Sequence, residues 1–139
     1  MTYNYLQVLK VGHQAIVCAI DQTQGFLRSY REARPRIRSL GEQLATFFSR
    51  QDKRMFDQLY AFYAGDRLST KMIDFLAHDL KDIKVKYLTF FDKHSGEVFD
   101  TSASSFPKDF MDFSGQIIGR LKIEEEYLFP LLEKMDQQV

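Results

Sequence analysis

The chain has 139 residues, the size of one ordinary domain and enough to bury an apolar core without disulfides. Hydrophobic residues make up 45% and charged residues 27%, a composition that excludes an intrinsically disordered chain. Basic and acidic residues both number 19, and this zero net charge disfavours a nucleic-acid-binding protein. The single cysteine, Cys18, excludes an internal disulfide, and neither an apolar run of about 20 residues nor a signal-peptide pattern is present. We therefore expect one soluble cytoplasmic domain, residues 1–139, that does not contact a membrane.

Four segments carry apolar residues at the three-and-four spacing of an amphipathic helix. The expected helices span about 3–30, about 36–64, from Ser69 or Thr70 to Lys93-His94, and from Pro107 towards the C-terminus. The three prolines, at 35, 107 and 130, fall where helices would start or stop, and Gly65-Asp66 is expected to end the second helix. Segment 94–106 is rich in Ser, Thr, Asp and Gly, which predicts a loop. The pattern predicts an all-α, antiparallel, up-down-up-down four-helix bundle.

The segment Arg120-Leu-Lys-Ile-Glu-Glu-Glu-Tyr-Leu-Phe-Pro-Leu-Leu132 resembles the last-helix signature of hemerythrin-like (HHE) domains. In that family a His and a Glu one helical turn apart point into a four-helix bundle and help to bind a pair of iron ions. Here Arg120 occupies the histidine position, and Gln51 and Met55 occupy the corresponding positions of the second helix. The resemblance implies the hemerythrin-like fold but a degraded ligand set, so we expect neither a metal nor another cofactor.

Four polar residues are expected to lie where the family has its metal. They are His13, Gln51, Arg120 and Glu124. A buried carboxylate without a partner is costly, and the guanidinium one turn before Glu124 would neutralise it. If the last helix is rotated, both groups instead lie at an edge, where the pair contributes little. His13 is read either as a residual metal ligand or as a core histidine hydrogen-bonded to a neighbour.

A second resemblance concerns Leu44–Leu59 and the run Arg120-Leu-Lys-Ile-Glu-Glu. Both are similar to segments of the Rsd/AlgQ family, metal-free helical bundles that bind the primary sigma factor of bacterial RNA polymerase. The chain departs from that family at Gln51-Asp52, which replaces a Gly-His pair. The resemblance implies a non-catalytic regulator of transcription that acts by binding a protein, with a sigma factor as the most concrete partner.

The expected partner-binding surface joins a basic run to aromatic residues that lie off the core stripe. Its members are Arg28, Arg31, Arg34, Phe56, Tyr60 and Tyr63. The aromatic rings would anchor the partner and the guanidiniums would form a charged rim. The same aromatic face would also suit a homodimer.

Two other functions stay open. A hemerythrin-like sensor of iron or oxygen would use an irregular ligand set. His78, expected to point away from the core with Lys81 near it, resembles the phosphorylated histidine of phosphotransfer domains, although Asp82 stands where those domains have Gly. No nucleophile–base pair or phosphate-binding glycine loop is visible, so we do not expect an enzyme.

Overall fold

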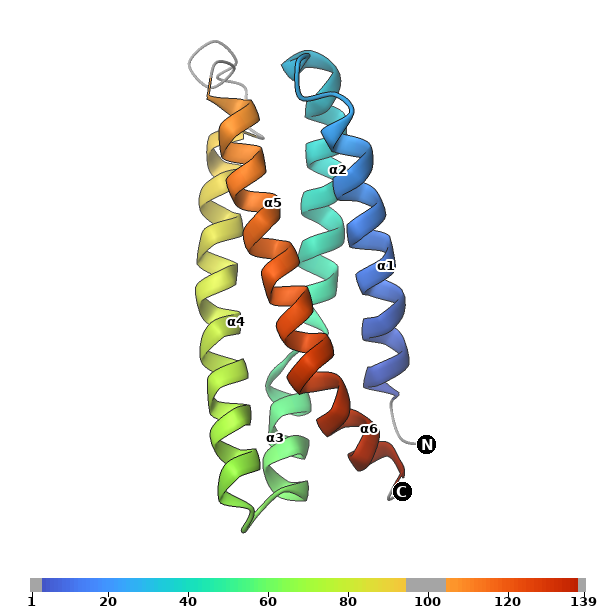
Figure 1. Cartoon of the computed structure of the whole chain (residues 1–139), viewed down its shortest axis with the longest axis vertical. Helices are drawn as coiled ribbons and strands as arrows, with labels where there is room; N and C mark the ends of the chain where they lie inside the picture. Colours follow the sequence, from blue (N-terminus) through green and yellow to red (C-terminus); the bar gives the residue numbers. More distant parts are fainter. Residues whose placement is uncertain (1–3, 95–104, 138–139) are drawn as a thin grey trace.

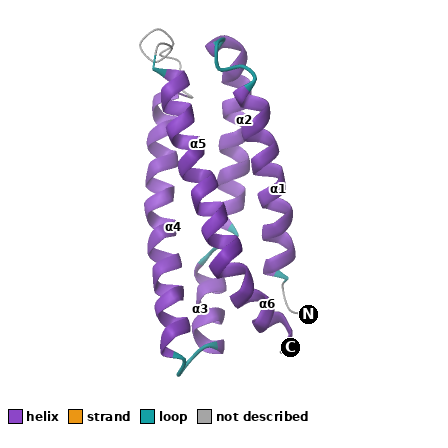
Figure 2. Ribbon diagram, in the orientation of Figure 1, coloured by secondary structure: helices purple, strands orange, loops and turns teal. Residues whose placement is uncertain are grey.

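A computed structural model describes residues 4–94 and 105–137, and within these ranges every regular element is helical (Figure 2). In chain order the elements are α1 (Tyr5–Gln24), α2 (Tyr30–Ser49), α3 (Lys53–Phe62), α4 (Arg67–His94), α5 (Phe106–Ile123), the π-helical turn η1 (Glu124–Leu128) and α6 (Phe129–Gln137). They form four rods: α1, then α2 with α3, then α4, then α5 continued by η1 and α6 (Figure 1). The predicted all-α four-helix bundle is confirmed.

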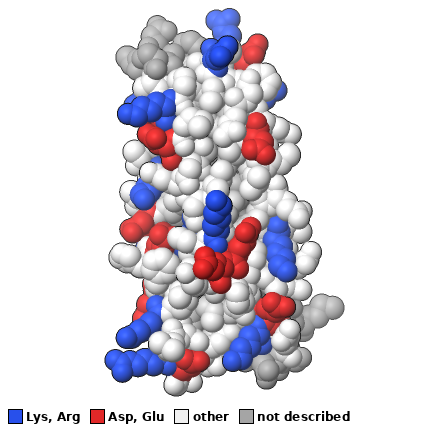
Figure 3. Space-filling model, viewed as in Figure 1, with Lys and Arg blue, Asp and Glu red and all other residues white. Residues whose placement is uncertain are grey.

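Each rod turns an apolar stripe towards the bundle axis, because buried residues recur every three or four positions. On α4 the stripe includes Ile73, Leu76, Leu80 and Ile83. Aromatic rings fill the half of the bundle where α4 ends, and the rings of Phe90 and Phe113 stack with centroids 4.2 Å apart. Acidic and basic side chains are intermixed on the outer face seen in Figure 3. None of the described helices is long and apolar enough to cross a membrane.

The first connection lies earlier in the chain than expected, because α1 ends at Gln24 and α2 begins at Tyr30. The prediction of a helix to residue 30 was wrong, as was the expectation that Pro35 marks a helix start. Ser29 caps α2 by accepting a hydrogen bond from the Glu32 N–H at 3.4 Å. Pro35 lies one turn inside α2, where it removes one backbone hydrogen bond, and burial of residues such as Ile37 stabilises the helix despite this loss.

The second rod is interrupted, whereas the sequence pattern predicted one helix over about 36–64. α2 ends at Ser49, and α3 starts at Lys53 with Asp52 as its N-cap, since the Asp52 side chain accepts from the Met55 N–H at 3.0 Å. An Asp followed by helix-forming residues is a usual start signal. The interruption leaves Gln51 between the two helices with its side chain directed into the core.

The expected N-cap of this helix, Ser69 or Thr70, was three to four residues late. Asp66 accepts a hydrogen bond from the Ser69 N–H at 3.2 Å, and α4 begins at Arg67. Gly65, at φ +90°, makes the turn before it, as expected of this breaker. Most of the predicted 94–106 loop lies outside the described residues.

The last rod continues past Pro130 towards the C-terminus, although the prolines were expected to fall roughly where helices start or stop. It does so through the π turn η1, in which the Phe129 N–H donates to the Glu124 carbonyl. Proline at position 130 has no N–H for residue 126, and its ring crowds that carbonyl, so a wider turn relieves the conflict. Figure 1 shows α6 leaving the direction of α5 at this point.

Candidate functional site

The four polar residues His13, Gln51, Arg120 and Glu124 are all buried, and the structure brings them into one cluster. We call them the polar core cluster. Glu124 is 0% and Arg120 2% exposed, although fully buried charged residues are rare unless they are paired. Arg120 comes from α5 and Glu124 from η1. His13 comes from α1, and Gln51 comes from the interruption between α2 and α3. Three of the four rods therefore contribute to the cluster.

Glu124 lies at the centre of the polar core cluster, and both of its carboxylate oxygens are satisfied by protein groups. Its Oε2 accepts hydrogen bonds from Arg120 Nε at 2.7 Å and from Gln51 Nε2 at 2.9 Å. Its Oε1 lies 2.8 Å from His13 Nε2. A buried carboxylate is tolerated when a cation and additional hydrogen bonds replace its hydration, and all of these are present here.

Arg120 links this carboxylate to α4, the rod that supplies none of the four predicted residues. Its Nη1 donates to the Leu76 carbonyl and to Asp79 Oδ2, both at 3.0 Å, and its Nη2 donates to Gln51 Oε1 at 3.0 Å. With the bond from Nε, four of the five guanidinium N–H groups have partners. The guanidinium thus ties α5 to α4 and to the interruption after α2.

His13 forms the opposite edge of the polar core cluster, towards α1. While Nε2 faces Glu124, Nδ1 lies 3.3 Å from Oε1 of Glu125, whose side chain is 59% exposed. Both ring nitrogens of His13 therefore face a carboxylate oxygen, one from buried Glu124 and one from exposed Glu125. The rings of Phe47 and Phe129 contact the imidazole, with centroids 5.3 and 4.7 Å away, and keep this edge apolar.

Two irregularities of the backbone place these side chains. The π turn η1 adds one residue to a helical turn, and both ends of η1, Glu124 and Leu128, face the core. The interruption at 50–52 turns Gln51 inward across from Glu124. Position 51 fell within the apolar arc of the predicted helix, but the interruption that directs its side chain was not predicted.

The residues do not fit the di-iron site of a hemerythrin-like fold. Arg120 and Gln51 stand at two positions where the resemblance implies metal ligands, and a guanidinium is a permanent cation without a lone pair to donate to a metal. Met55, fully buried, fills a third position with a weak thioether ligand. Within residues 4–94 and 105–137, no three His, Cys, Asp or Glu side chains are arranged to hold a metal ion.

Two aromatic residues of the predicted partner surface are buried inside the chain, so that part of the prediction was wrong. Phe56 is 7% and Tyr63 4% exposed. α3 starts anew after the interruption and packs against both α4 and α6, so its buried arc is wider than a single stripe. Tyr63 Oη donates to the Leu131 carbonyl at 2.5 Å, and Tyr60, partly buried, donates to Asp74. Phe56 and Tyr63 are core residues of this chain.

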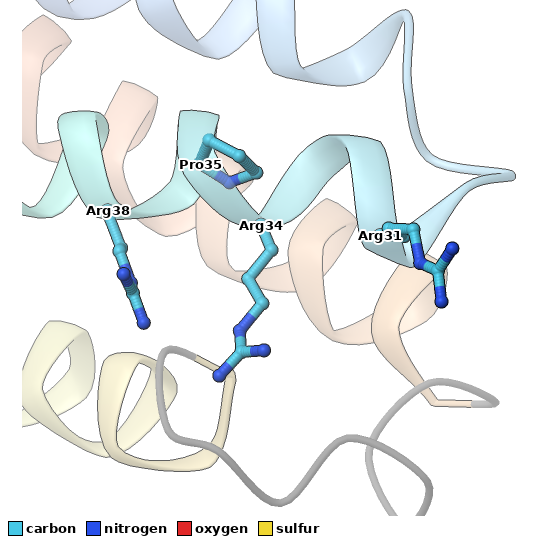
Figure 4. A pocket seen from close by; sticks show the side chains of 4 residues that line it. All are labelled: Arg31, Arg34, Pro35 and Arg38. Atoms are coloured by element: carbon cyan, nitrogen blue, oxygen red, sulfur yellow. The ribbon is translucent and has the colours of Figure 1, made fainter.

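The basic part of the predicted surface does lie outside the core. Arg28 and Arg31 are exposed and Arg34 is partly buried, all around the start of α2. Arg31, Arg34 and Arg38 line a hollow of about 510 Å³ together with Pro35. Figure 4 shows Arg34 and Arg38 extending from α2 in the same direction, with Arg31 nearer the start of the helix.

Sequence reasoning missed a second buried histidine with a carboxylate partner. His94, 0% exposed, has Nε2 2.8 Å from Asp109 Oδ2, and Lys93 Nζ lies 2.9 Å from the same oxygen. Burial raises the pKa of Asp109, but hydrogen bonds from Lys93, His94 and Ser105 outweigh it and lower the pKa below its usual value. In the sequence, the only sign of this pair is that His94 lies near the end of one helix and Asp109 in the first turn of the next.

His78, the predicted phosphotransfer candidate, lies on the outer face of α4 with its side chain 80% exposed. Its Nε2 is 3.8 Å from Asp82 Oδ2, one turn further along the helix. The carboxylate would repel a phosphoryl group on the imidazole. Cys18, the single cysteine of the sequence, is exposed on α1.

Asp79 and Glu125 border the polar core cluster, and the sequence did not single them out because their partners, Arg120 and His13, lie on other helices. Comparison of the chain with protein-family models, with curated proteins and with solved structures finds no match. The functional argument therefore depends on the site itself.

Proposed function

We propose that this chain is a non-catalytic, metal-independent regulatory bundle that acts by binding another protein. The observation that carries the proposal is the position of Arg120. Its guanidinium neutralises Glu124 at the place where a hemerythrin-like bundle has its metal. A permanent cation bonded at 2.7 Å leaves no reason for a metal ion to bind the same carboxylate.

The polar core cluster supports a structural role in this proposal. It connects α1, α4, α5 and the interruption after α2 through hydrogen bonds of defined direction. Such a network holds the rods in one register, which an apolar core alone specifies less strictly. A rigid bundle of fixed shape suits a protein that presents a preformed surface to a partner.

The most concrete partner is a bacterial primary sigma factor, which follows from the resemblance to the Rsd/AlgQ family. Three residues of that resemblance lie at the polar core cluster. Arg120 and Glu124 belong to it, and Glu125 borders it. Binding would occlude the surface that the sigma factor offers to polymerase. The buried positions of Phe56 and Tyr63 move the expected contact away from these rings and towards the exposed arginines of α2.

Two measurements test the proposal. Size-exclusion chromatography of the purified chain with a purified primary sigma factor should give a complex, and core polymerase without sigma serves as the control. Metal analysis of the same preparation should find less than stoichiometric iron. A stoichiometric iron content with an oxo-to-iron charge-transfer band would overturn the proposal in favour of the iron or oxygen sensor.

A further inference from the structure

The outer face of α4 exposes large apolar side chains along a helix that runs the length of the bundle (Figure 1). Phe75 is 47%, Val85 64% and Leu88 53% exposed. α4 packs against α2, α3, α5 and η1 through its other side, where Leu76 and Leu80 are buried. Single apolar residues are common on protein surfaces, but three along the outside of one helix favour a surface that another helix covers.

Charged side chains of both signs share this face with the apolar ones. Lys71, Lys81, Asp82 and Asp92 are all exposed. Lys71 lies near the start of α4 and Asp92 near its end, while Lys81 and Asp82 adjoin in the middle in the same order of sign. A face with a basic first half and an acidic second half is complementary to a copy of itself that runs in the opposite direction.

The middle of this face falls between Lys81 and Asp82. At about 100° per residue, this point lies about 170° from the mean direction of the buried stripe of α4, so it faces outward. In a twofold dimer with its axis at this point, residues equally far from the axis on the two copies face each other. Lys81 then meets Asp82 of the second copy, and Lys71 meets Asp92. Both charge pairs are attractive, and the symmetry makes each of them occur twice.

The same axis pairs the exposed apolar side chains with each other. Phe75 meets Leu88 of the second copy, and Val85 meets the imidazole of His78, whose side chain is 80% exposed. Val85 and His78 lie close to the centre line of the face, whereas Phe75 and Leu88 flank it on opposite sides. Association would therefore remove all three exposed apolar side chains from water.

The charges also select this position of the axis over its neighbours. Moving the axis one turn towards the start of α4 would place Asp74 opposite Asp82 of the second copy, a repulsive contact. Moving it one turn towards the end of the helix would place Lys81 opposite Thr89, which carries no charge. With the axis between Lys81 and Asp82, Asp74 faces Thr89 and keeps the hydrogen bond that it accepts from Tyr60.

We propose that two copies of this chain associate through the outer faces of their α4 helices, antiparallel and about a twofold axis between Lys81 and Asp82. The proposal goes beyond the binding of another protein and does not depend on it. The rings of the expected aromatic dimer face, Phe56 and Tyr63, are buried, and α4 offers an exposed face instead. A contact one helix wide with charges at its centre gives a dimer with a dissociation constant in the micromolar range, which weakens as salt is added.

The test reverses the charges at the axis and measures the dimer dissociation constant of the full chain by sedimentation equilibrium. Lys81→Asp alone, or Asp82→Lys alone, turns both attractive contacts at the axis into repulsive ones. An equal mixture of these two variants restores both contacts in a mixed dimer, and so does the double swap in one chain. The control is the mixture of Lys10→Asp and Asp21→Lys, which changes the net charges equally at exposed positions of α1. Circular dichroism checks that all variants keep their helical content.

We expect each single variant at the axis to weaken the dimer about tenfold or more, and the mixture and the double swap to restore it to within about threefold. The α1 variants, alone or mixed, should change it by less than about threefold. An unaltered chain that stays monomeric up to about 0.5 mM would overturn the proposal. So would a dimer that Lys81→Asp leaves unchanged, or a loss that neither the mixture nor the double swap restores. The expected set of results supports the dimer whether or not the sigma factor binds.

Discussion

The polar core cluster and the start of α2 both contain arginines, but in different surroundings. Arg120 is buried, and four of its N–H groups donate to Glu124, Asp79, Gln51 and a backbone carbonyl. At the start of α2, by contrast, Arg28, Arg31 and Arg38 are exposed to solvent. The buried guanidinium is held by partners within the chain, which stabilises the fold, whereas the exposed arginines contribute little to stability because solvent screens their charge.

The largest expected effect comes from breaking the buried pair. Replacing Arg120→Met leaves Glu124 buried without its cation, which should lower the free energy of unfolding by about 3–5 kcal/mol. Urea denaturation followed by circular dichroism measures this loss. Adding Glu124→Leu to the same chain removes the stranded charge and should regain most of the stability. A loss below about 1 kcal/mol for Arg120→Met would mean that the Arg120–Glu124 pair contributes no more than an ordinary surface ion pair.

A smaller loss is expected from the neutral member of the polar core cluster. Gln51→Leu keeps the side-chain volume but removes a donor to Glu124 and the acceptor of Arg120 Nη2, which should cost about 1–3 kcal/mol of unfolding free energy. The same denaturation experiment on Gln14→Leu, at an exposed position of α1, provides the comparison. The inward role of Gln51 is refuted if the two variants have equal stability.

In its exposure Asp109 lies between the buried polar core cluster and the exposed arginines of α2. It is partly exposed and contacts both Lys93 and His94. Its pKa is lowered in the folded chain, so its contribution to stability is present above the unfolded value of 3.8 and is lost as pH falls through the folded value. The unfolding free energy of the natural chain should therefore fall more steeply below pH 3.8 than that of Asp109→Asn. If the unfolding free energies of the two proteins depend on pH in the same way below pH 3.8, this contribution of Asp109 to stability is contradicted.

The smallest effect is expected at two exposed arginines of α2. Arg31→Gln with Arg38→Gln should change the unfolding free energy by no more than about 0.5 kcal/mol, and towards greater stability, since like charges and an opposing helix dipole are both reduced. Salt should stabilise the natural chain more than this variant. Urea denaturation at low and high salt measures both quantities, and a loss above about 1 kcal/mol would mean that these arginines support the fold.

The sequence by itself determined the fold class and the four polar core positions. Helical spacing is a local property, so apolar stripes such as Ile73, Leu76, Leu80 and Ile83 predict a helix without knowledge of its neighbours. The cost of burying an unpaired carboxylate likewise predicts a cation close to Glu124, and Arg120 one turn away is the available one.

Only the tertiary structure decided which groups complete the cluster and which aromatic residues are exposed. Asp79 and Glu125 contact Arg120 and His13 across separate helices, and spacing along one helix cannot predict such contacts. If α2 and α3 are treated as one straight helix, Phe56 and Tyr63 lie off its core stripe. The interruption at 50–52 lets α3 pack against both α4 and α6, and this second interface buries the two rings.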